Sequence, residues 1–105
     1  MKHPAISPEI INYSKTIRLM GKDQRLQASH VCLYTALFVC WQRAGFLSPF
    51  SFTRKQLMAF SKIASIATYH KCIRELDAYQ YIRYQPSYHP QKGSLVYWPE
   101  TAISL

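Results

Sequence analysis

The sequence contains little glycine and little acid, and both shortages limit its chemistry. Three glycines among 105 residues are too few to build a glycine-rich loop around a nucleotide phosphate. The five acidic residues are scattered and form no pair suited to catalysis, and the chain has neither a nucleophile elbow nor an HExxH motif. We therefore expect a protein that is not an enzyme and that binds no cofactor.

Cysteine is scarce as well, and its pattern excludes common metal modules. Three cysteines are an odd number, and a short chain without a signal-peptide pattern is expected to be cytoplasmic with reduced thiols. Cys32, Cys40 and Cys72 lack the CxxC spacing of zinc modules. His70 and Cys72 would point in different directions on a helix. We predict no metal site and expect all three cysteines to lie in the core.

A hydrophobic run long enough to cross a membrane is also missing. The segment 29–44 is almost wholly apolar but shorter than the about 20 residues that a bilayer requires, so no membrane partner is predicted. A helix that is apolar on every side must be buried on every side. We expect it to pack on a helix at 8–20, on the two helices that follow it, and on a second subunit. The chain is thus predicted to form a homodimer, unless the N-terminal helix and residues 46–52 cover the central helix completely.

The same central helix could line a ligand pocket, but a packed core is the simpler interpretation. No small-molecule effector is therefore predicted. The overall composition, with 49% hydrophobic and 17% charged residues, favours one compact folded domain over a disordered chain.

Basic residues are what the chain has in excess. Thirteen Lys and Arg against five acids give a formal charge of +8 and a pI near 9.6, which is typical of nucleic-acid-binding domains. The excess is spread evenly over the two halves of the chain, so folding must assemble any basic patch. No predicted helix pairs a basic face with a clean apolar face, which disfavours binding to a membrane surface. An acidic polymer is the expected partner.

The N-terminal helix has a clear start signal. Ser7 can cap it, Pro8 suits the first helical position, and Gly21 is predicted to end the helix at 8–20. Ile6 and Ile11 are predicted to form a hydrophobic staple. The predicted core face carries Ile10, Tyr13, Ile17 and Met20, and the other side carries Lys15, Arg18 and Lys22, which either contact phosphates or only keep the protein in solution.

Two closely joined helices are predicted further along the chain. Thr53 can cap the first, at 54–61, with Gln56 placed to complete a capping box. A turn at 62–65 without glycine follows, and Ser65 can cap the second helix, at 66–79.

The second of these helices has two distinct faces. Its predicted core stripe consists of Ile66, Tyr69, Ile73 and Leu76, with Cys72 at the edge. The opposite face is small or cationic and holds Ala67, Lys71, Arg74 and Ala78, with His70 beside them. The acids Glu75 and Asp77 come late in the helix. Such a face suits the major groove of DNA, where Lys and Arg meet guanine acceptors and phosphates. The alternative is an ordinary solvated helix face.

A β-hairpin is predicted to follow. The runs 81–85 and 94–98 read as strands, and residues 86–93 form a loop because they contain two prolines and a glycine. In such a loop Lys92 could bind phosphate together with Arg83, and His89 or Gln91 could reach a minor groove. The segment 46–52 could add a third strand, which Pro49 would confine to an edge of the sheet.

This run of residues resembles the helix-turn-helix of bacterial winged-helix regulators over about half of the chain. In those proteins a Thr-apolar pair opens the reading helix, two apolar positions follow, and an apolar pair begins the wing. The matching residues are Thr68-Tyr69, Ile73, Leu76 and Tyr81-Ile82. The departures are a turn without glycine and Gln80 where such proteins often carry glycine. The whole chain also resembles small transcriptional regulators of bacterial mobile elements, which implies DNA binding without indicating an operator.

Together these patterns predict an α+β, mainly helical fold, a winged helix-turn-helix with three or four helices and a C-terminal β-hairpin wing. We expect a single domain, 1–105, made of an N-terminal helix extension (1–22), a central apolar helix (29–44), the helix-turn-helix (53–79) and the wing (81–98).

The predicted function is sequence-specific binding of double-stranded DNA in transcription regulation. The candidate DNA contacts are Thr68, His70, Lys71 and Arg74 in the major groove, Arg54 and Lys55 at a helix start, and Arg83, His89 and Lys92 in the wing. One alternative is an accessory protein for replication or excision of a mobile element. Another is a protein interaction module that docks a partner through the aromatic hairpin residues Tyr81, Tyr84, Tyr88, Tyr97 and Trp98.

Overall fold

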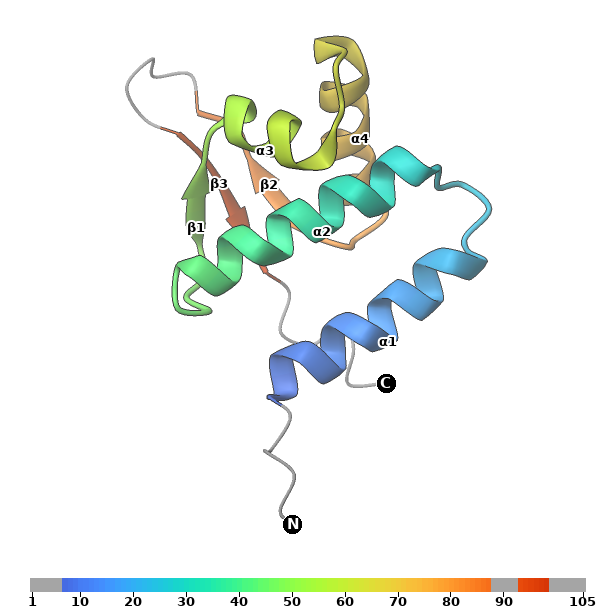
Figure 1. Ribbon diagram of the computed structural model, residues 1–105, viewed down its shortest axis with the longest axis vertical. Coiled ribbons are helices and arrows are strands. Elements are labelled where there is room, and N and C mark those ends of the chain that lie inside the picture. Colours follow the sequence, from blue (N-terminus) through green and yellow to red (C-terminus); the bar gives the residue numbers. More distant parts are fainter. Residues whose placement is uncertain (1–6, 88–92, 99–105) are drawn as a thin grey trace.

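The computed structural model describes residues 7–87 and 93–98 (Figure 1). These residues form four helices and one three-stranded antiparallel sheet, so the fold is α+β and mainly helical. The elements, in chain order, are α1 (Pro8–Lys22), α2 (Ala28–Arg43), β1 (Phe50–Phe52), α3 (Arg54–Ser61), α4 (Ile66–Ala78), β2 (Arg83–Gln85) and β3 (Ser94–Tyr97). The fold class and the order of the elements agree with the sequence prediction.

Helix α2 divides the molecule into two parts. In Figure 1, α1 lies beside α2 and runs in the opposite direction, while α3, α4 and the sheet lie on the other side of α2. The contacts agree with this view, because α2 packs against α1, α3, α4 and β1. The core is therefore built around one central helix, as its apolar sequence predicts.

Helix α1 begins where predicted but ends later. The Ser7 side chain accepts a hydrogen bond from the Ile10 amide at 3.2 Å, and Pro8 occupies the first turn. The prediction that Gly21 ends the helix is wrong, because the helix continues to Lys22. A glycine keeps its amide hydrogen bond and only lowers helix propensity, so a helix that packs on a neighbour can pass through it.

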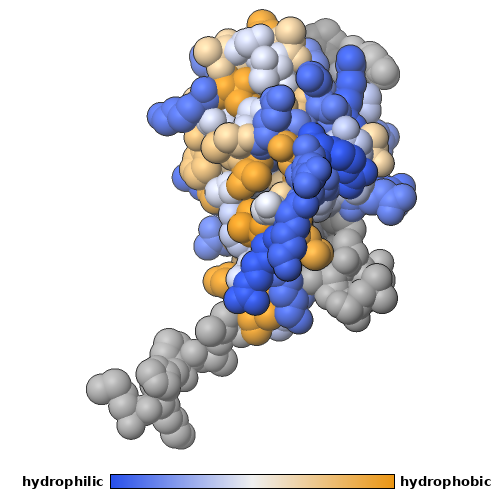
Figure 2. Space-filling view, turned by 90° about the vertical axis from the view of Figure 1, so that its right-hand side faces the viewer, coloured by the Kyte–Doolittle hydropathy of each residue, from blue (hydrophilic) through white to orange (hydrophobic). Residues whose placement is uncertain are grey.

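The outward side of α1 is more apolar than predicted. Ile10 was expected in the core but is 50% exposed, because burial on α1 is concentrated at Thr16 and Met20. Ile11 is also exposed, and its predicted staple partner Ile6 lies outside the described residues. Seen from the right-hand side of Figure 1, hydrophilic residues form a diagonal band with exposed hydrophobic residues beside it (Figure 2).

Within the single chain α2 is not covered on every side, so the alternative that the N-terminal helix and residues 46–52 cover it completely is wrong, while burial by a second subunit stays a prediction. Leu33 and Leu37 are completely buried, but Cys40 is half-buried and Cys32 is exposed. The neighbouring elements leave one strip of the helix surface open to solvent. Of the three cysteines that were expected in the core, only Cys72 is fully buried.

The sheet has the strand order β1-β3-β2, with both pairs antiparallel. Val96 in the central strand pairs with Phe50 on one side and with Tyr84 on the other, and it is completely buried. The hairpin and the third strand at the sheet edge are thus confirmed. The strands are shorter than predicted, since β2 begins only at Arg83.

Trp98, directly after β3, belongs to the core. It is 6% exposed, and its ring centroid lies 4.8 Å from that of Trp41 and 5.0 Å from that of Tyr34, both on α2. Its backbone amide donates a hydrogen bond to Ser48 Oγ at 2.8 Å. This ring therefore joins the end of the hairpin to the central helix and is not available to a docking partner.

Three non-glycine residues within the described part of the chain, Phe46, Lys62 and Gln80, adopt left-handed backbone conformations, and two of them adjoin α3 and α4. Lys62 has φ 64° in the turn after α3, and Gln80 has φ 68° after α4. The Gln80 amide donates to the Asp77 carbonyl at 3.0 Å, and the Tyr81 amide donates to the Leu76 carbonyl at 2.9 Å. These two bonds form a Schellman motif, which ends α4 and directs the chain toward β2.

Gly93 is required by a close backbone approach. A Cβ atom at this position would lie 2.6 Å from the carbonyl oxygen of Phe52, on the neighbouring strand β1. Any larger residue would therefore separate the hairpin from β1. The glycine that marks a loop in the sequence thus also lets the three strands come together.

Candidate nucleic-acid interface

Helix α4 presents a small and cationic face to solvent. The helix starts at the Ser65 cap, whose side chain accepts a hydrogen bond from the Thr68 amide at 3.2 Å. Ala67, Lys71 and Arg74 are all exposed. This outward face agrees with the one predicted from helical periodicity.

The buried side of α4 differs from the predicted stripe at one end. Tyr69, Cys72, Ile73 and Leu76 are each at most 2% exposed, so Cys72 is a full member of the core. The prediction that Ile66 lies in the core is wrong, because this side chain is 49% exposed. Periodicity gives the direction of a side chain but not whether another element lies opposite it.

Two of the predicted contact residues on α4 are only half-exposed. The His70 ring packs against the Tyr69 ring, with centroids 5.3 Å apart. Thr68 lies four residues before the buried Cys72, so the two side chains are neighbours along one side of the helix, and Thr68 is at the edge of the buried side. The structure thus brings Lys71, Arg74 and the edge of His70 together, and it places Thr68 to one side.

Both acids of α4 are held in intramolecular hydrogen bonds. Glu75 Oε1 lies 3.0 Å from His30 Nε2, and Glu75 Oε2 accepts a hydrogen bond from the Tyr79 hydroxyl at 3.2 Å. Asp77 Oδ1 accepts a hydrogen bond from the Tyr84 amide at 3.2 Å. No acid occurs in the sequence between Asp23 and Glu75. The first turns of α4 therefore carry no carboxylate of their own.

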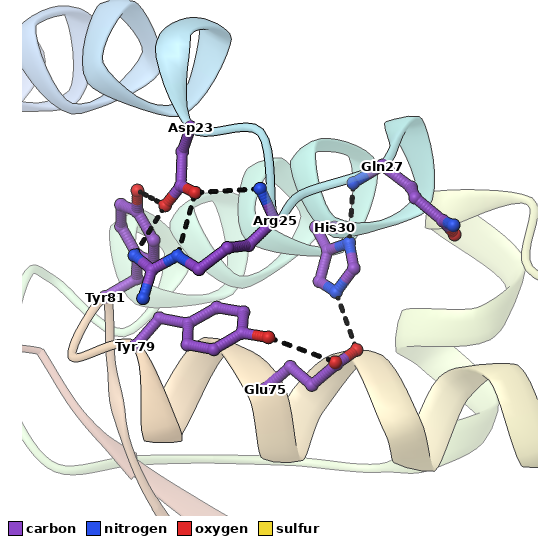
Figure 3. A network of polar contacts seen from close by, with 7 residues as sticks. All are labelled: Asp23, Arg25, Gln27, His30, Glu75, Tyr79 and Tyr81. Atoms are coloured by element: carbon purple, nitrogen blue, oxygen red, sulfur yellow. Dashed lines mark hydrogen bonds and ion pairs between the residues drawn. The ribbon is translucent and has the colours of Figure 1, made fainter.

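His30 connects α2 to α4, as Figure 3 shows. It is 2% exposed, and its Nδ1 accepts a hydrogen bond from the Gln27 amide at 2.8 Å. An amide can only donate, so in neutral His30 the proton is on Nε2 and is donated to Glu75. The hydrogen bond from His30 is the main cause that lowers the pKa of Glu75, and the hydrogen bond from Tyr79 contributes to it.

A second network of polar side chains joins the connection between α1 and α2 to the segment before β2 (Figure 3). Asp23 forms two side-chain bonds with Arg25, of 2.9 and 2.7 Å, and accepts a hydrogen bond from the Tyr81 hydroxyl at 2.7 Å. These partners, Arg25 first, hold the pKa of Asp23 far below its ordinary value. The Arg25 guanidinium also lies 4.1 Å from the centre of the Tyr79 ring. The His30–Glu75 bond thus fixes the second half of α4 to the start of α2, and the Asp23 network fixes the segment after α4 to the connection before α2.

We expect these networks to make the fold sensitive to acid. The pKa values of Asp23 and Glu75 are both lowered, so their stabilisation is complete above their ordinary values, near about 4, and is lost as pH falls further. Urea unfolding at pH 7, 5 and 3 should show a loss of stability below about pH 4. The Asp23→Asn variant should have a lower free energy of unfolding than the native chain at pH 7. Its free energy of unfolding should also fall less when the pH is lowered. An unchanged acid response in that variant would contradict the role of this carboxylate.

The start of α3 adds two exposed cations. Thr53 and Gln56 form the predicted capping box, with both hydrogen bonds at 3.2 Å, and Arg54 and Lys55 follow the cap in the first turn. Burial raises the pKa of Tyr69 on α4, and the positive charge of Arg54 partly opposes this rise. Arg54 therefore lies within electrostatic reach of α4.

The hairpin residues are only partly described. Arg83 is exposed and pairs with Tyr97 across the strands, with its guanidinium 5.2 Å from the centre of the Tyr97 ring. Arg83 is the first residue of β2 and so lies at the end of the hairpin away from residues 88–92. The predicted contacts His89, Gln91 and Lys92 lie outside the described residues.

Two of the candidate cations, Arg54 and Lys55 in the first turn of α3, lie toward the end of the molecule where α4 begins, whereas Arg83 lies at the start of β2, the other end of that strand. In Figure 1 the beginnings of α3 and α4, and the ends of β2 and β3 nearest to residues 88–92, lie at the same end. Helix α1, with Lys15, Arg18 and Lys22, lies at the opposite end. The α1 cations therefore do not join the face formed by α3 and α4.

Sequence reasoning missed three residues that bear on this region. Lys62 is exposed in the turn between α3 and α4, and its place inside that turn was a signal that could have identified it. Ile66 is exposed at the start of α4. His30 was not recognised as a structural partner, although its spacing from Gln27 is that of a capping box.

Comparison with known proteins adds no assignment. No family model matches the sequence, and neither a curated protein nor a solved structure matches it. Within residues 7–87 and 93–98, no group of His, Cys, Asp and Glu is arranged to hold a metal ion. In the same part of the chain, no helix combines the length and apolar character needed to cross a bilayer.

Proposed function

We propose that the protein is a winged helix-turn-helix protein that binds double-stranded DNA, with α4 in the major groove, and that it regulates transcription. The observation that carries the proposal is the outward face of α4, where Lys71 and Arg74 are exposed and the only acids of the helix are bonded elsewhere. Cationic side chains on an acid-free helix face attract the phosphates of DNA and can donate to guanine acceptors.

The arrangement of the other elements supports the same proposal. A short helix, a turn and a second helix are followed by an antiparallel hairpin, and β1 completes a small sheet with strand order β1-β3-β2. Arg54 and Lys55 at the start of α3 lie at the same end of the molecule as the start of α4. In this geometry α4 reads bases while α3 and the hairpin hold the DNA backbone.

A homodimer is part of the proposal. The open strip of α2, which includes Cys32 and part of Cys40, supplies apolar surface that a second copy could cover. Two-fold dimers match the two-fold symmetric sites that helix-turn-helix proteins occupy. Equilibrium sedimentation gives the oligomeric state directly.

The proposal is tested by selecting bound fragments from random duplex DNA and sequencing them. We expect one enriched motif, and binding to it that weakens steeply as the salt concentration rises, because each neutralised phosphate releases counterions. Recovery of no motif, with weak binding at low salt only, would contradict sequence-specific regulation.

Two alternatives predict different results in the same experiment. An accessory protein for replication or excision of a mobile element would also bind DNA, and the location of its sites in the element would distinguish it from a regulator. A protein interaction module would show neither a motif nor a steep dependence on salt. Burial of Trp98 leaves such a module with a smaller aromatic surface on the hairpin.

A further inference from the structure

Ile66 is an unusual residue at the start of a cationic helix face. It is the first residue of α4, next to the Ser65 cap, and it is 49% exposed. The buried residues of the helix begin only at Tyr69, one turn later. A β-branched apolar residue gains nothing for helix formation at this exposed position, since alanine has the higher helix propensity.

Ile66 forms one row with two of the proposed DNA contacts. Ile66, His70 and Arg74 are each four residues apart, and residues with this spacing are neighbours along one side of a helix. Ala67 and Lys71 form the adjacent row. The outward surface therefore begins with apolar groups at the start of α4 and becomes cationic toward the middle.

The major groove offers one apolar group to such a helix. Thymine carries a C5 methyl group at the base edge, whereas the other groups that bases display there are hydrogen-bond donors and acceptors. The first residues of a reading helix are the ones that contact base edges. An aliphatic side chain at the first position of α4 is thus placed to contact a thymine methyl group.

We propose that Ile66 determines sequence specificity by packing against a thymine methyl group. The inference rests on the proposed DNA binding and goes beyond it, because it predicts a T·A pair at one defined position of each half-site. Arg74, two turns further along the same row, contacts a guanine or a phosphate at a neighbouring position.

The test uses the duplex obtained by selection and replaces its thymines one at a time by uracil, which removes only the methyl group. We expect one position in each half-site where the replacement weakens binding about three- to fivefold, as the loss of one buried methyl contact predicts. Ile66→Ala should bind the unmodified duplex more weakly by a similar factor. It should also become insensitive to uracil at that position.

Leu19→Ala is the matched control. Leu19 is a 56% exposed aliphatic residue on α1, at the end of the molecule opposite the start of α4. This variant should keep both the affinity and the sensitivity to uracil. Thermal unfolding of both variants should remain close to that of the native chain, since neither residue is buried.

Each outcome bears on a different claim. If a motif is enriched but no uracil replacement matters, or if Ile66→Ala remains sensitive, the thymine contact is wrong while DNA binding stands. If Ile66→Ala binds every duplex as the native chain does, Ile66 makes no contact with DNA and the proposed thymine contact is wrong. If no duplex is enriched, the proposed function fails, and the thymine contact fails with it.

Discussion

Trp98→Ala is expected to lower the free energy of unfolding by about 3 to 5 kcal/mol, the range found when large buried aromatic residues are truncated to alanine. The Trp98 ring stacks on Trp41 and lies against Tyr34 and Phe50, with centroid distances of 4.8, 5.0 and 6.3 Å. Its removal leaves a cavity between the hairpin and α2 that these rigid rings cannot close. Urea unfolding followed by far-UV circular dichroism measures the change.

Two further variants make this prediction specific. Trp98→Phe keeps most of the packing, so it should lower the free energy of unfolding clearly less than Trp98→Ala does. Leu47→Ala removes a side chain that is 70% exposed and should change the stability by no more than about 0.5 kcal/mol. A native-like stability of Trp98→Ala would mean that the ring is not part of the core. It would then again be available for docking a partner.

Lys71→Ala and Arg74→Ala are expected to weaken binding to the selected duplex by about 1 to 3 kcal/mol each if they contact bases. Both residues are exposed on the outward face of α4 and make no contact that holds the core, so their removal should leave the fold intact. A residue that contacts only phosphate would instead weaken binding equally for all sequences and lower the salt slope by about 1. Fluorescence anisotropy at several salt concentrations separates the two cases.

Arg18→Ala and Lys22→Ala are the charge-matched controls. They remove the same unit of positive charge from α1, at the opposite end of the molecule, where both residues are exposed. They should reduce affinity only slightly, because exposed charges beyond about 10 Å are screened at 0.1 M salt. If the α1 variants lose as much affinity for the duplex as the α4 variants, binding depends on the total charge of the protein and not on the face of α4.

The starts of α1, α3 and α4 could be predicted because their signals are local. Ser7, Thr53 and Ser65 each cap the helix that follows them, as their positions in the sequence indicate. The outward placement of Lys71 and Arg74 follows from helical periodicity within a few turns. The strands were harder to delimit, because pairing with β3 decides where β2 begins.

What could not be predicted depends on residues far apart in the chain. Ile66 and Ile10 are about half exposed because none of the described elements covers them, and neither periodicity nor hydrophobicity indicates this. The partnership of His30 with Glu75 joins residues 45 positions apart. It also withdraws a carboxylate from the surface that is proposed to face DNA.

The sequence by itself determined the composition of the chain, its positive charge, the caps and the order of helices and strands, because these depend on neighbouring residues. Only the tertiary structure decided which face of each helix meets solvent, because a side chain is buried only when another element packs against it. It also placed Trp98 in the core and brought the starts of α3 and α4 to one end of the molecule. The apolar residue Ile66 at the front of a cationic face is a result of that packing.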